Sequence, residues 1–403
     1  MGPMARTYER THPWITFRLD LGKFGYRSWL LLGEAQSKAN HVAGLPLLPR
    51  VRDDLHQLYL AKGIHATTAI EGNTLTEDDV LRQLKGELQV PPSKEYLKQE
   101  IENVLAACNS IPARLRPDAD PRIEVDDLCR WNSLILNGLS VAEGVIPGKI
   151  RDSLQVVVAR YPGAPPADCA YLLDRLCRWL NTGFEDLERD EPIAAAILKA
   201  ILGHLYLAWI HPFGDGNGRT ARLLELFVLF SAGIPSTSAH LLSNHYNQTR
   251  GEYYRLLAAS SRADSETGVR DFVHYALQGY VDNLREQIEH VKQQQLAVHL
   301  VNYIHGLFRD KPGAATARRR ALALALVGQE RPVPPSEIRT VTSTIASLYA
   351  RKTAKTVQRD LNVLRGMKLI KDLPEGIGIR RELMIEFTPT QFPRGHQSQA
   401  SSS

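Results

Sequence analysis

The sequence lacks the features of an exported or membrane-spanning chain. No stretch of the 403 residues approaches the ~18 uninterrupted apolar residues that a membrane helix needs. The start, Met-Gly-Pro-Met-Ala-Arg, has no apolar signal core and no Ser or Thr at its sixth position for myristoylation. The four cysteines form no CxxC pair and no metal-ligand spacing, which indicates buried thiols in a reducing compartment. We therefore expect a cytoplasmic protein with no membrane partner.

The composition is that of a globular protein, with 43% hydrophobic and 23% charged residues. A chain of this length is expected to hold two or three domains with their own cores. The net charge of +5 is unevenly distributed, because residues 310–390 contain 15 Lys and Arg against 8 Asp and Glu. This excess of +7 indicates a separate role for the C-terminal segment, with an anionic partner as one candidate.

Helical periodicity dominates the chain before residue 310. Apolar residues recur at helical spacing over 50–110, 125–136, 169–181, 192–210, 220–232 and 268–309. One stretch before residue 330, Leu154–Arg160, alternates as a strand would and ends in a Tyr-Pro-Gly turn, so a hairpin is expected there. The predicted fold class is therefore mainly α, with a small β-hairpin.

Residues 317–390 have a pattern of their own. Helices are expected over 319–327, 337–349 and 353–367, followed by a hairpin over 369–387 that turns at Pro374-Glu-Gly. Three helices and a hairpin are the elements of a winged helix. The polar Gln- and Ser-rich residues 391–403 are predicted to be a disordered tail.

The segment that indicates chemistry is His211-Pro-Phe-Gly-Asp-Gly-Asn-Gly-Arg-Thr-Ala-Arg222, between two apolar helices. Its glycines let backbone N–H groups turn inward, and the loop leads into a helix N-terminus, where unpaired N–H groups favour an anion. Arg219 and Arg222 offer forked cations for phosphate, Asp215 is a candidate Mg²⁺ ligand, and His211 can accept a hydroxyl proton near neutral pH. This set of groups fits phosphoryl or nucleotidyl transfer.

This segment resembles the Fic family motif, H-P-F-x-D-G-N-G-R-x-x-R, at every specified position. The resemblance covers roughly residues 1–300 and implies a mostly helical enzyme that transfers AMP from ATP to a Tyr, Thr or Ser hydroxyl of a protein. It implies His211 as the general base and Asp215 as the ligand of Mg²⁺. The implied nucleotide-binding residues of the motif are His211, Gly216, Asn217, Gly218, Arg219, Thr220, Ala221 and Arg222, with the γ-phosphate on Arg222.

A second resemblance lies upstream, at Thr67-Thr-Ala-Ile-Glu71-Gly72, which is similar to the family's inhibitory pattern [S/T]-x-x-x-E-[G/N]. It implies that Glu71 pairs with Arg222 and keeps the γ-phosphate away, as in the N-terminally inhibited class. A carboxylate on Arg222 would occupy the fork that the γ-phosphate needs. The alternative is a solvated glutamate at a helix end, with Gly72 as the terminator.

Two further segments resemble parts of the same family. Gly148-Lys-Ile150-Arg151, leading into the expected hairpin, resembles the flap whose open edge pairs with the target's backbone. The alternative there is an ordinary surface hairpin. Residues 247–254 resemble the segment near the adenine, with Thr249 and Tyr253 as the candidate contacts, although tyrosines at this spacing also suit a core.

The expected organisation is an N-terminal helical region with the inhibitory helix (1–110), a Fic core (111–309), a winged helix (317–390) and the tail. Two classes of function follow from it. The first is an adenylyltransferase that uses ATP and Mg²⁺ on a protein target, itself included, and removal of AMP would use the same site. The second is a DNA-binding regulator whose Fic fold senses a nucleotide. Residues 353–365 have the form of a recognition helix for DNA, and the alternative is a surface for protein contacts or a homodimer.

Overall fold

The computed structural model describes residues 6–18, 20–45, 47, 49–115, 121–152, 162–262, 266–329 and 331–387. The chain divides into two compact units, Met1–Ile288 and Glu289–Ser403, and each is considered by itself. The expected hairpin over 154–160 and the tail over 391–403 lie outside the described residues. The finer domain boundaries expected from the sequence remain predictions.

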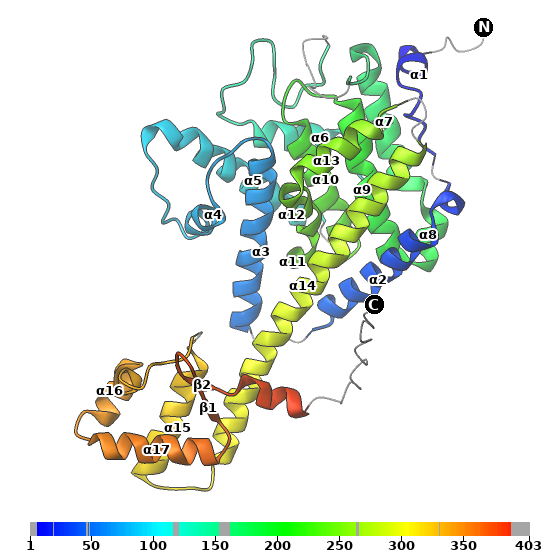
Figure 1. Ribbon diagram of the computed structural model, residues 1–403. Coiled ribbons are helices and arrows are strands. Elements are labelled where there is room, and N and C mark those ends of the chain that lie inside the picture. The colour runs from blue at the N-terminus through cyan, green and yellow to red at the C-terminus, as the bar shows by residue number, and fades with distance from the viewer. Residues whose placement is uncertain are drawn as a thin grey trace, which may run out of the picture. The chain divides into compact units, whose positions relative to one another are not determined.

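Unit 1 is mainly helical in the part that the structure describes, which confirms the mainly α fold class (Figure 1). Its longer helices are α2 (Tyr26–Ala43), α3 (Pro49–Ile70), α4 (Glu77–Leu84), α5 (Glu95–Arg114), α6 (Val125–Ile135), α7 (Pro166–Thr182), α9 (Pro192–Ile210), α10 (Asn217–Ser231), α12 (Leu241–Gln248), α13 (Arg250–Ala259) and the first part of α14 (Glu266–Leu307). Short elements are α1 (Thr7–Thr11), η1 (Leu21–Lys23), η2 (Pro92–Lys94), α8 (Glu185–Asp190) and α11 (Ser236–Ala239).

Helix α9 forms the centre of unit 1. Pro192 occupies its first turn, where a missing N–H costs nothing, and every residue from Ala194 to Ile210 is buried. By length and composition α9 could cross a membrane, which the sequence analysis did not expect, but 94% of its most apolar window is buried inside the protein. Burial of this kind is typical of the central helix of a globular core.

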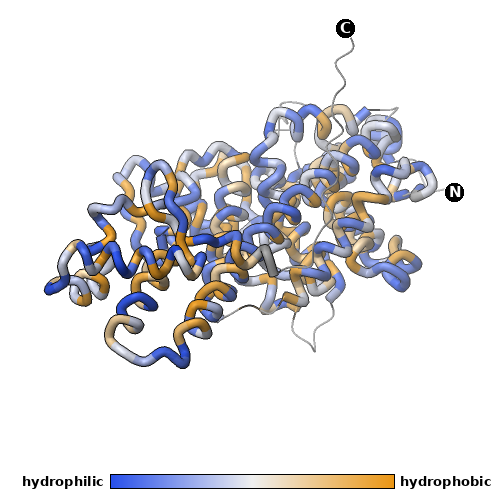
Figure 2. Tube along the Cα trace, turned by 60° about the horizontal axis from the view of Figure 1, so that its bottom comes forward, coloured by the Kyte–Doolittle hydropathy of each residue, from blue (hydrophilic) through white to orange (hydrophobic). Residues whose placement is uncertain are grey.

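Helix α10 packs along α9 and also contacts α3, α5 and α6, so it brings the motif beside the end of α3 (Figure 1). It begins at Asn217, three residues before the predicted start, because Gly216 adopts a left-handed conformation that starts the helix. The outer helices are amphipathic, and hydrophobic and hydrophilic stretches alternate along the chain in Figure 2. The expected helix over 268–309 is one unbroken helix, α14.

Unit 2 contains α15 (Ala314–Val327), η3 (Ile338–Thr340), α16 (Ser343–Tyr349), α17 (Ala354–Gly366), strands β1 (Ile370–Leu373) and β2 (Gly376–Ile379), and η4 (Arg381–Phe387). The strands are antiparallel, with Ile370 opposite Ile379, and Val333 bridges to Ile377. Their apolar side chains share one core with α15, α16, α17 and the last part of α14. The order of helices and hairpin is the expected one, and the assignment as a winged helix remains a prediction.

Two details of unit 2 differ from the prediction. The helix expected over 337–349 is two elements, because Thr342 is extended and caps α16 with its hydroxyl, 3.2 Å from the N–H of Ile345. The hairpin expected to reach residue 387 ends at Ile379, and the 3-10 helix η4 follows. Helix α17 is fixed to α15 by the fully buried Asp360, whose two oxygens lie 2.7 Å from Nε of Arg318 and of Arg319.

Candidate active site

The motif forms the loop between α9 and α10. His211 ends α9 in a left-handed conformation (φ 49°), which turns the chain sharply at the point where the core helix stops. The side chain of Asn217 then closes the loop on itself: its Oδ1 accepts the N–H of Phe213 at 2.9 Å, and its Nδ2 donates to the carbonyl of Phe213 at 2.8 Å. Asn217 therefore shapes the loop with its side chain and leaves the start of α10 to present backbone N–H groups.

His211 lies in a poorly solvated position next to a cation. Nε of Arg151 donates to the carbonyl of His211 at 2.7 Å, and the backbone near Gly163 packs against the Cβ of His211. Burial and then the positive charge of Arg151 lower the pKa of His211 to about 4. The imidazole is therefore neutral at pH 7 and able to accept a proton, as the sequence analysis expected of a general base.

The first turn of α10 has the geometry of the predicted anion site, and a carboxylate covers it. Gly216 has φ 76°, and Gly218 has no side chain, so nothing from α10 itself blocks the first turn. A Cβ placed on Gly218 would collide with Oε1 of Glu71. Thr220 and Ala221 are buried, and the Thr220 hydroxyl donates to the carbonyl of Gly216 at 2.9 Å, so these two residues contribute to the shape of the turn.

Glu71 and Arg222 are paired as predicted. Oε1 of Glu71 lies 2.6 Å from Nη2 of Arg222, which also donates to the carbonyl of Thr67 at 3.0 Å. The Arg222 side chain is 1% exposed and that of Glu71 is 32% exposed. Burial would raise the pKa of Glu71, but the Arg222 and Arg219 cations outweigh it and hold the pKa below its usual value. Gly72 ends α3 directly after Glu71 with φ 104°.

Arg219, the other predicted phosphate ligand, is engaged by two carboxylates. Its Nη1 lies 2.6 Å from Glu100 on α5, and its Nη2 lies 3.3 Å from Asp215. The second oxygen of Glu100 accepts a hydrogen bond of 2.9 Å from Nδ2 of Asn73, which directly follows Gly72. A chain of polar contacts thus joins the end of α3 to the motif through α5.

Glu100, Asn73 and Asn132 are not among the site residues predicted from the sequence. A signal was present for Glu100 and Asn132, because each is a polar residue on the apolar stripe of its helix: Glu100 lies three residues after the buried Leu97, and Asn132 lies four after Leu128. Buried polar groups of this kind need hydrogen-bond partners. Asn73 gave no comparable signal.

The start of the predicted flap lies against the motif. Ile150 forms a β-bridge with Phe213, and the N–H of Arg151 donates to the carbonyl of Pro212 at 2.9 Å. The guanidinium of Arg151 also donates to the carbonyl of Ala164, which comes after residues 153–161 in the sequence. A cavity of about 210 Å³ opens beside this bridge, between residues 142–146 and 149–152 on one side and Gly214 of the motif on the other.

The predicted adenine contacts already have protein partners. The hydroxyl of Thr249 donates to the carbonyl of His245 at 2.7 Å, and the hydroxyl of the buried Tyr253 lies 2.9 Å from Nε2 of His204. Tyr254, which the sequence analysis did not select, donates to the carbonyl of Ile70 at 3.2 Å, directly before Glu71. Contact of Thr249 and Tyr253 with a nucleotide remains a prediction.

Asp215 is suited to hold Mg²⁺ together with substrate phosphates. Its side chain is 48% exposed and lies at the edge of the anion site, where Oδ1 also accepts the N–H of Gly216 at 2.5 Å. Within the described residues there is no group of three or more His, Cys, Asp or Glu side chains that could hold a metal alone. Mg²⁺ is commonly held by one or two carboxylates with phosphate oxygens and water, so a single carboxylate here fits that ion.

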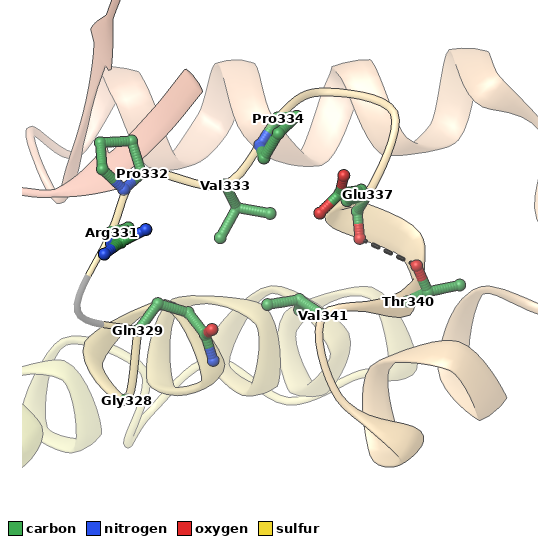
Figure 3. Close-up of a pocket in the computed structure, with 9 residues that line it drawn as sticks. All are labelled: Gly328, Gln329, Arg331, Pro332, Val333, Pro334, Glu337, Thr340 and Val341. Atoms are coloured by element: carbon green, nitrogen blue, oxygen red, sulfur yellow. Dashed lines mark hydrogen bonds between the residues drawn. The ribbon is translucent and has the colours of Figure 1, made fainter. Parts of the chain in front are cut away.

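Unit 2 has a hollow of its own, with a volume of about 730 Å³. It is lined by Gly328, Gln329, Arg331, Pro332, Val333, Pro334, Glu337, Thr340 and Val341, and Figure 3 shows these side chains around the turn that precedes η3. Thr340 donates to the carbonyl of Glu337 at 3.1 Å, so its hydroxyl supports the turn. None of the predicted catalytic residues lines this hollow.

Comparisons with known proteins agree with the arrangement of the motif. The Fic/DOC family matches residues 122–229, which include α6, the start of the flap and the whole motif. The chain is 29% identical over 242 residues to protein adenylyltransferase fic-1 of Caenorhabditis elegans, covering 60% of this chain and 43% of the relative. It is 32% identical over 212 residues to protein adenylyltransferase Fic of Drosophila melanogaster, covering 53% and 39%. The matches therefore span less than half the length of these relatives.

Solved structures share the fold. Fic-1 from Caenorhabditis elegans has a TM-score of 0.53 and 25% identity, over 66% of this chain and 73% of that one. A Fic family protein from Desulfovibrio desulfuricans has a TM-score of 0.52 and 21% identity, over 87% and 92%, a likeness of fold alone. From its motif, its fold and these similarities, the chain contains a Fic domain at residues 122–229.

Proposed function

We propose that this chain is a protein adenylyltransferase that transfers AMP from ATP to a Tyr, Thr or Ser hydroxyl of a protein. The observation that carries the proposal is the loop from His211 to Arg222, with a neutral imidazole at one end and the anion site of α10 at the other. The relatives named protein adenylyltransferase support the same reaction.

The residues of the site have distinct roles in this reaction. The backbone N–H groups at the start of α10 hold the phosphates, and Arg222 takes the γ-phosphate once Glu71 withdraws. The hydroxyl oxygen of the target attacks the α-phosphorus, and the bond from that phosphorus to the oxygen bridging to the β-phosphorus breaks. Pyrophosphate leaves, and the hydroxyl proton passes to His211. Asp215 would hold Mg²⁺, which offsets phosphate charge when bound.

Labelled ATP tests the reaction directly. The purified Glu71→Gly chain, in which no carboxylate covers Arg222, is incubated with ATP labelled at either the α- or the γ-phosphate, and protein should retain the α-label only. His211→Ala should slow labelling by about 10²–10⁴-fold, the usual contribution of a general base, while ATP still binds. His41→Ala, an exposed histidine on α2, is the matched control. Retention of the γ-label would mean phosphorylation and would overturn the proposal, as would the absence of both labels.

We also propose that helix α17 of unit 2 binds duplex DNA through its phosphates. Val357, Asp360 and Leu361 are buried, so α17 turns Lys355 and Arg359 outward, one turn apart. Neither of these cations has an ion pair with any described residue, unlike Arg365 on the same helix, which lies 2.7 Å from Asp372. Two exposed unpaired cations on an anchored helix suit contact with a phosphate backbone.

Binding of the full chain to a fluorescent duplex of mixed sequence tests this second proposal. Affinity for the duplex should fall by about tenfold or more between 50 and 200 mM salt, because neutralising several phosphates releases their counterions. Lys355→Ala with Arg359→Ala should weaken binding and flatten the salt dependence. Arg50→Ala with Arg52→Ala, an exposed basic pair on α3, removes the same charge as a control. No retention at 50 mM salt, or equal binding by both double variants, would contradict a role for α17.

A further inference from the structure

Asn132 connects three parts of the site from its place in the last turn of α6. Its Nδ2 donates to the carbonyl of Asp215 at 2.8 Å and lies 3.3 Å from the hydroxyl of Thr220, and its Oδ1 accepts the N–H of Gly148 at 2.9 Å. The residue is 1% exposed. Its orientation is fixed by these partners, because a carbonyl requires the donor end of the amide and an N–H requires the acceptor end.

Two glycines allow this close approach. Gly148 and Gly216 have φ of 79° and 76°, which other residues adopt at a cost. A Cβ on Gly216 would lie 2.9 Å from Nδ2 of Asn132, and a Cβ on Gly148 would lie 2.9 Å from the carbonyl oxygen of Cys129, also on α6. The motif loop and the start of the flap therefore both rest on the same turn of α6.

These two segments are the walls of the 210 Å³ cavity beside the motif. Residues 142–146 and 149–152 form one wall and Gly214 belongs to the other, where Val145 packs so closely that a Cβ on Gly214 would lie 2.8 Å from it. The distance between the walls is thus set by what holds each segment. Asn132 is hydrogen-bonded to residues that adjoin both walls in the sequence, Gly148 next to Lys149 and Asp215 next to Gly214.

We propose that Asn132 is a positioning residue that holds the target-binding flap in register with the phosphate-binding loop. The proposal rests on the proposed adenylyltransferase function. A target chain paired with the flap presents its hydroxyl at a place set by Gly148, whereas ATP presents its α-phosphate at a place set by the loop around Asp215. The amide of Asn132 fixes the start of the flap relative to the phosphate-binding loop. An error of about 1 Å between reacting groups can slow a reaction about 10²-fold.

Two substitutions distinguish the hydrogen bond to Asp215 from the hydrogen bond to Gly148. Asn132→Ala removes both, whereas Asn132→Asp keeps an acceptor for the N–H of Gly148 and loses the donor to Asp215. Ser133→Ala, at the exposed neighbouring position, is the matched control. All three are made in the Glu71→Gly chain, and protein labelling by α-labelled ATP, affinity for ATP and hydrogen exchange of the Gly148 amide are measured for each.

Asn132→Ala should speed exchange at Gly148 and slow labelling by about tenfold or more relative to Ser133→Ala. Asn132→Asp should keep Gly148 protected while labelling and ATP affinity fall together, and it also serves if the alanine variant fails to fold. Labelling by Asn132→Ala at the rate of the control would overturn the proposal, as would unchanged exchange at Gly148. If the Glu71→Gly parent labels nothing, the adenylyltransferase function fails instead, and exchange with ATP affinity then decides the role of Asn132.

Discussion

Oε1 of Glu71 lies 2.6 Å from Nη2 of Arg222, and the same oxygen occupies the space where a side chain on Gly218 would begin. One carboxylate therefore covers both the guanidinium and the first turn of α10. These are the two groups that a triphosphate needs in the proposed reaction. Blockage of both by one side chain predicts that a single substitution releases both.

Glu71→Gly should increase AMP transfer to protein. Because a hydrogen bond to a charged group contributes about 1.5–3 kcal/mol, the freed contact between Arg222 and the γ-phosphate should raise labelling by about tenfold or more. The measurement is the initial rate of labelling by α-labelled ATP. Glu87→Gly, at an exposed position after α4, should leave the rate unchanged.

The double variant Glu71→Gly with Arg222→Ala tests the cause of this gain. If the freed arginine is responsible, the gain should vanish in the double variant, so the two effects should be strongly non-additive. Equal rates for Glu71→Gly with and without Arg222 would show that the carboxylate acts elsewhere. If Glu71→Gly does not increase labelling of several protein targets, Glu71 is not inhibitory and is only a residue at a helix end.

Asn73→Ala should produce a smaller gain without altering either member of the pair. The side chain of Asn73 donates to the carbonyl of Leu97 and to Glu100, each at 2.9 Å, and so fastens the chain just after Glu71 to α5. A hydrogen bond contributes about 0.5–1.5 kcal/mol, so labelling should rise between about two- and tenfold. Gln99→Ala, which removes a comparable amide contact within α5, is the control. Unchanged or reduced labelling by a folded Asn73→Ala chain would contradict a role for this contact in inhibition.

The fold class and the motif could be predicted from the sequence because both depend on local patterns. The apolar residues of α9, the glycines of the loop and the pattern from Thr67 to Glu71 and Gly72 are each visible within a few residues. The pairing of Glu71 with Arg222 could be predicted only through the family resemblance, since 151 residues separate them. Its geometry then follows from the packing of α3 against α10.

The supporting residues could not be predicted in the same way. Glu100 and Asn132 stood out only as polar residues on apolar faces, and such a pattern does not say which distant group satisfies them. Asn132 meets a carbonyl 83 residues away, and Glu100 meets a guanidinium 119 residues away. The break before α16 was missed for a local reason, because Thr342 caps a helix inside a stretch that is otherwise periodic.

The activity of the Glu71→Gly chain should depend on pH in the way that a neutral, partly buried His211 requires. The pKa of His211 is about 4 in the chain with Glu71, whose negative charge raises it, so the pKa is no higher in the Glu71→Gly chain. His211 therefore stays deprotonated down to about pH 5, and kcat/KM should be flat between pH 6 and 8 and fall only as the pH approaches the pKa. A solvated histidine would instead lose its basic form below about pH 6.5. Because Arg151 contributes to the lowered pKa, Arg151→Gln should move the acid limb to higher pH. If the rate of the Glu71→Gly chain falls with a midpoint near pH 6.5, poor solvation does not lower the pKa of His211 as inferred.

In unit 2, Asp360→Ala should destabilise helix α17 and its packing against α15. The carboxylate is fully buried, accepts hydrogen bonds from Arg318 and Arg319, and lies 3.0 Å from the hydroxyl of Tyr349. Its loss would leave the buried Arg318 without a counter-charge, and removal of one partner from a buried pair costs about 3–5 kcal/mol. Hydrogen exchange of the α17 amides in the full chain measures this cost. Asp372→Ala, which breaks the exposed pair with Arg365, should change exchange far less.

The same carboxylate gives the stability of unit 2 a defined dependence on pH. Burial would raise the pKa of Asp360, but the hydrogen bonds from Arg318 and Arg319 outweigh it and hold the pKa below its ordinary value of 3.8. Its stabilising contribution is therefore complete above that ordinary value and is lost as the pH falls through the lower pKa of the folded state. Wild-type α17 amides should lose protection over this acid range, and Asp360→Ala should lack that part of the change. If both chains lose protection in parallel, another group must cause the acid sensitivity of α17, and Asp360 contributes to its stability by packing alone.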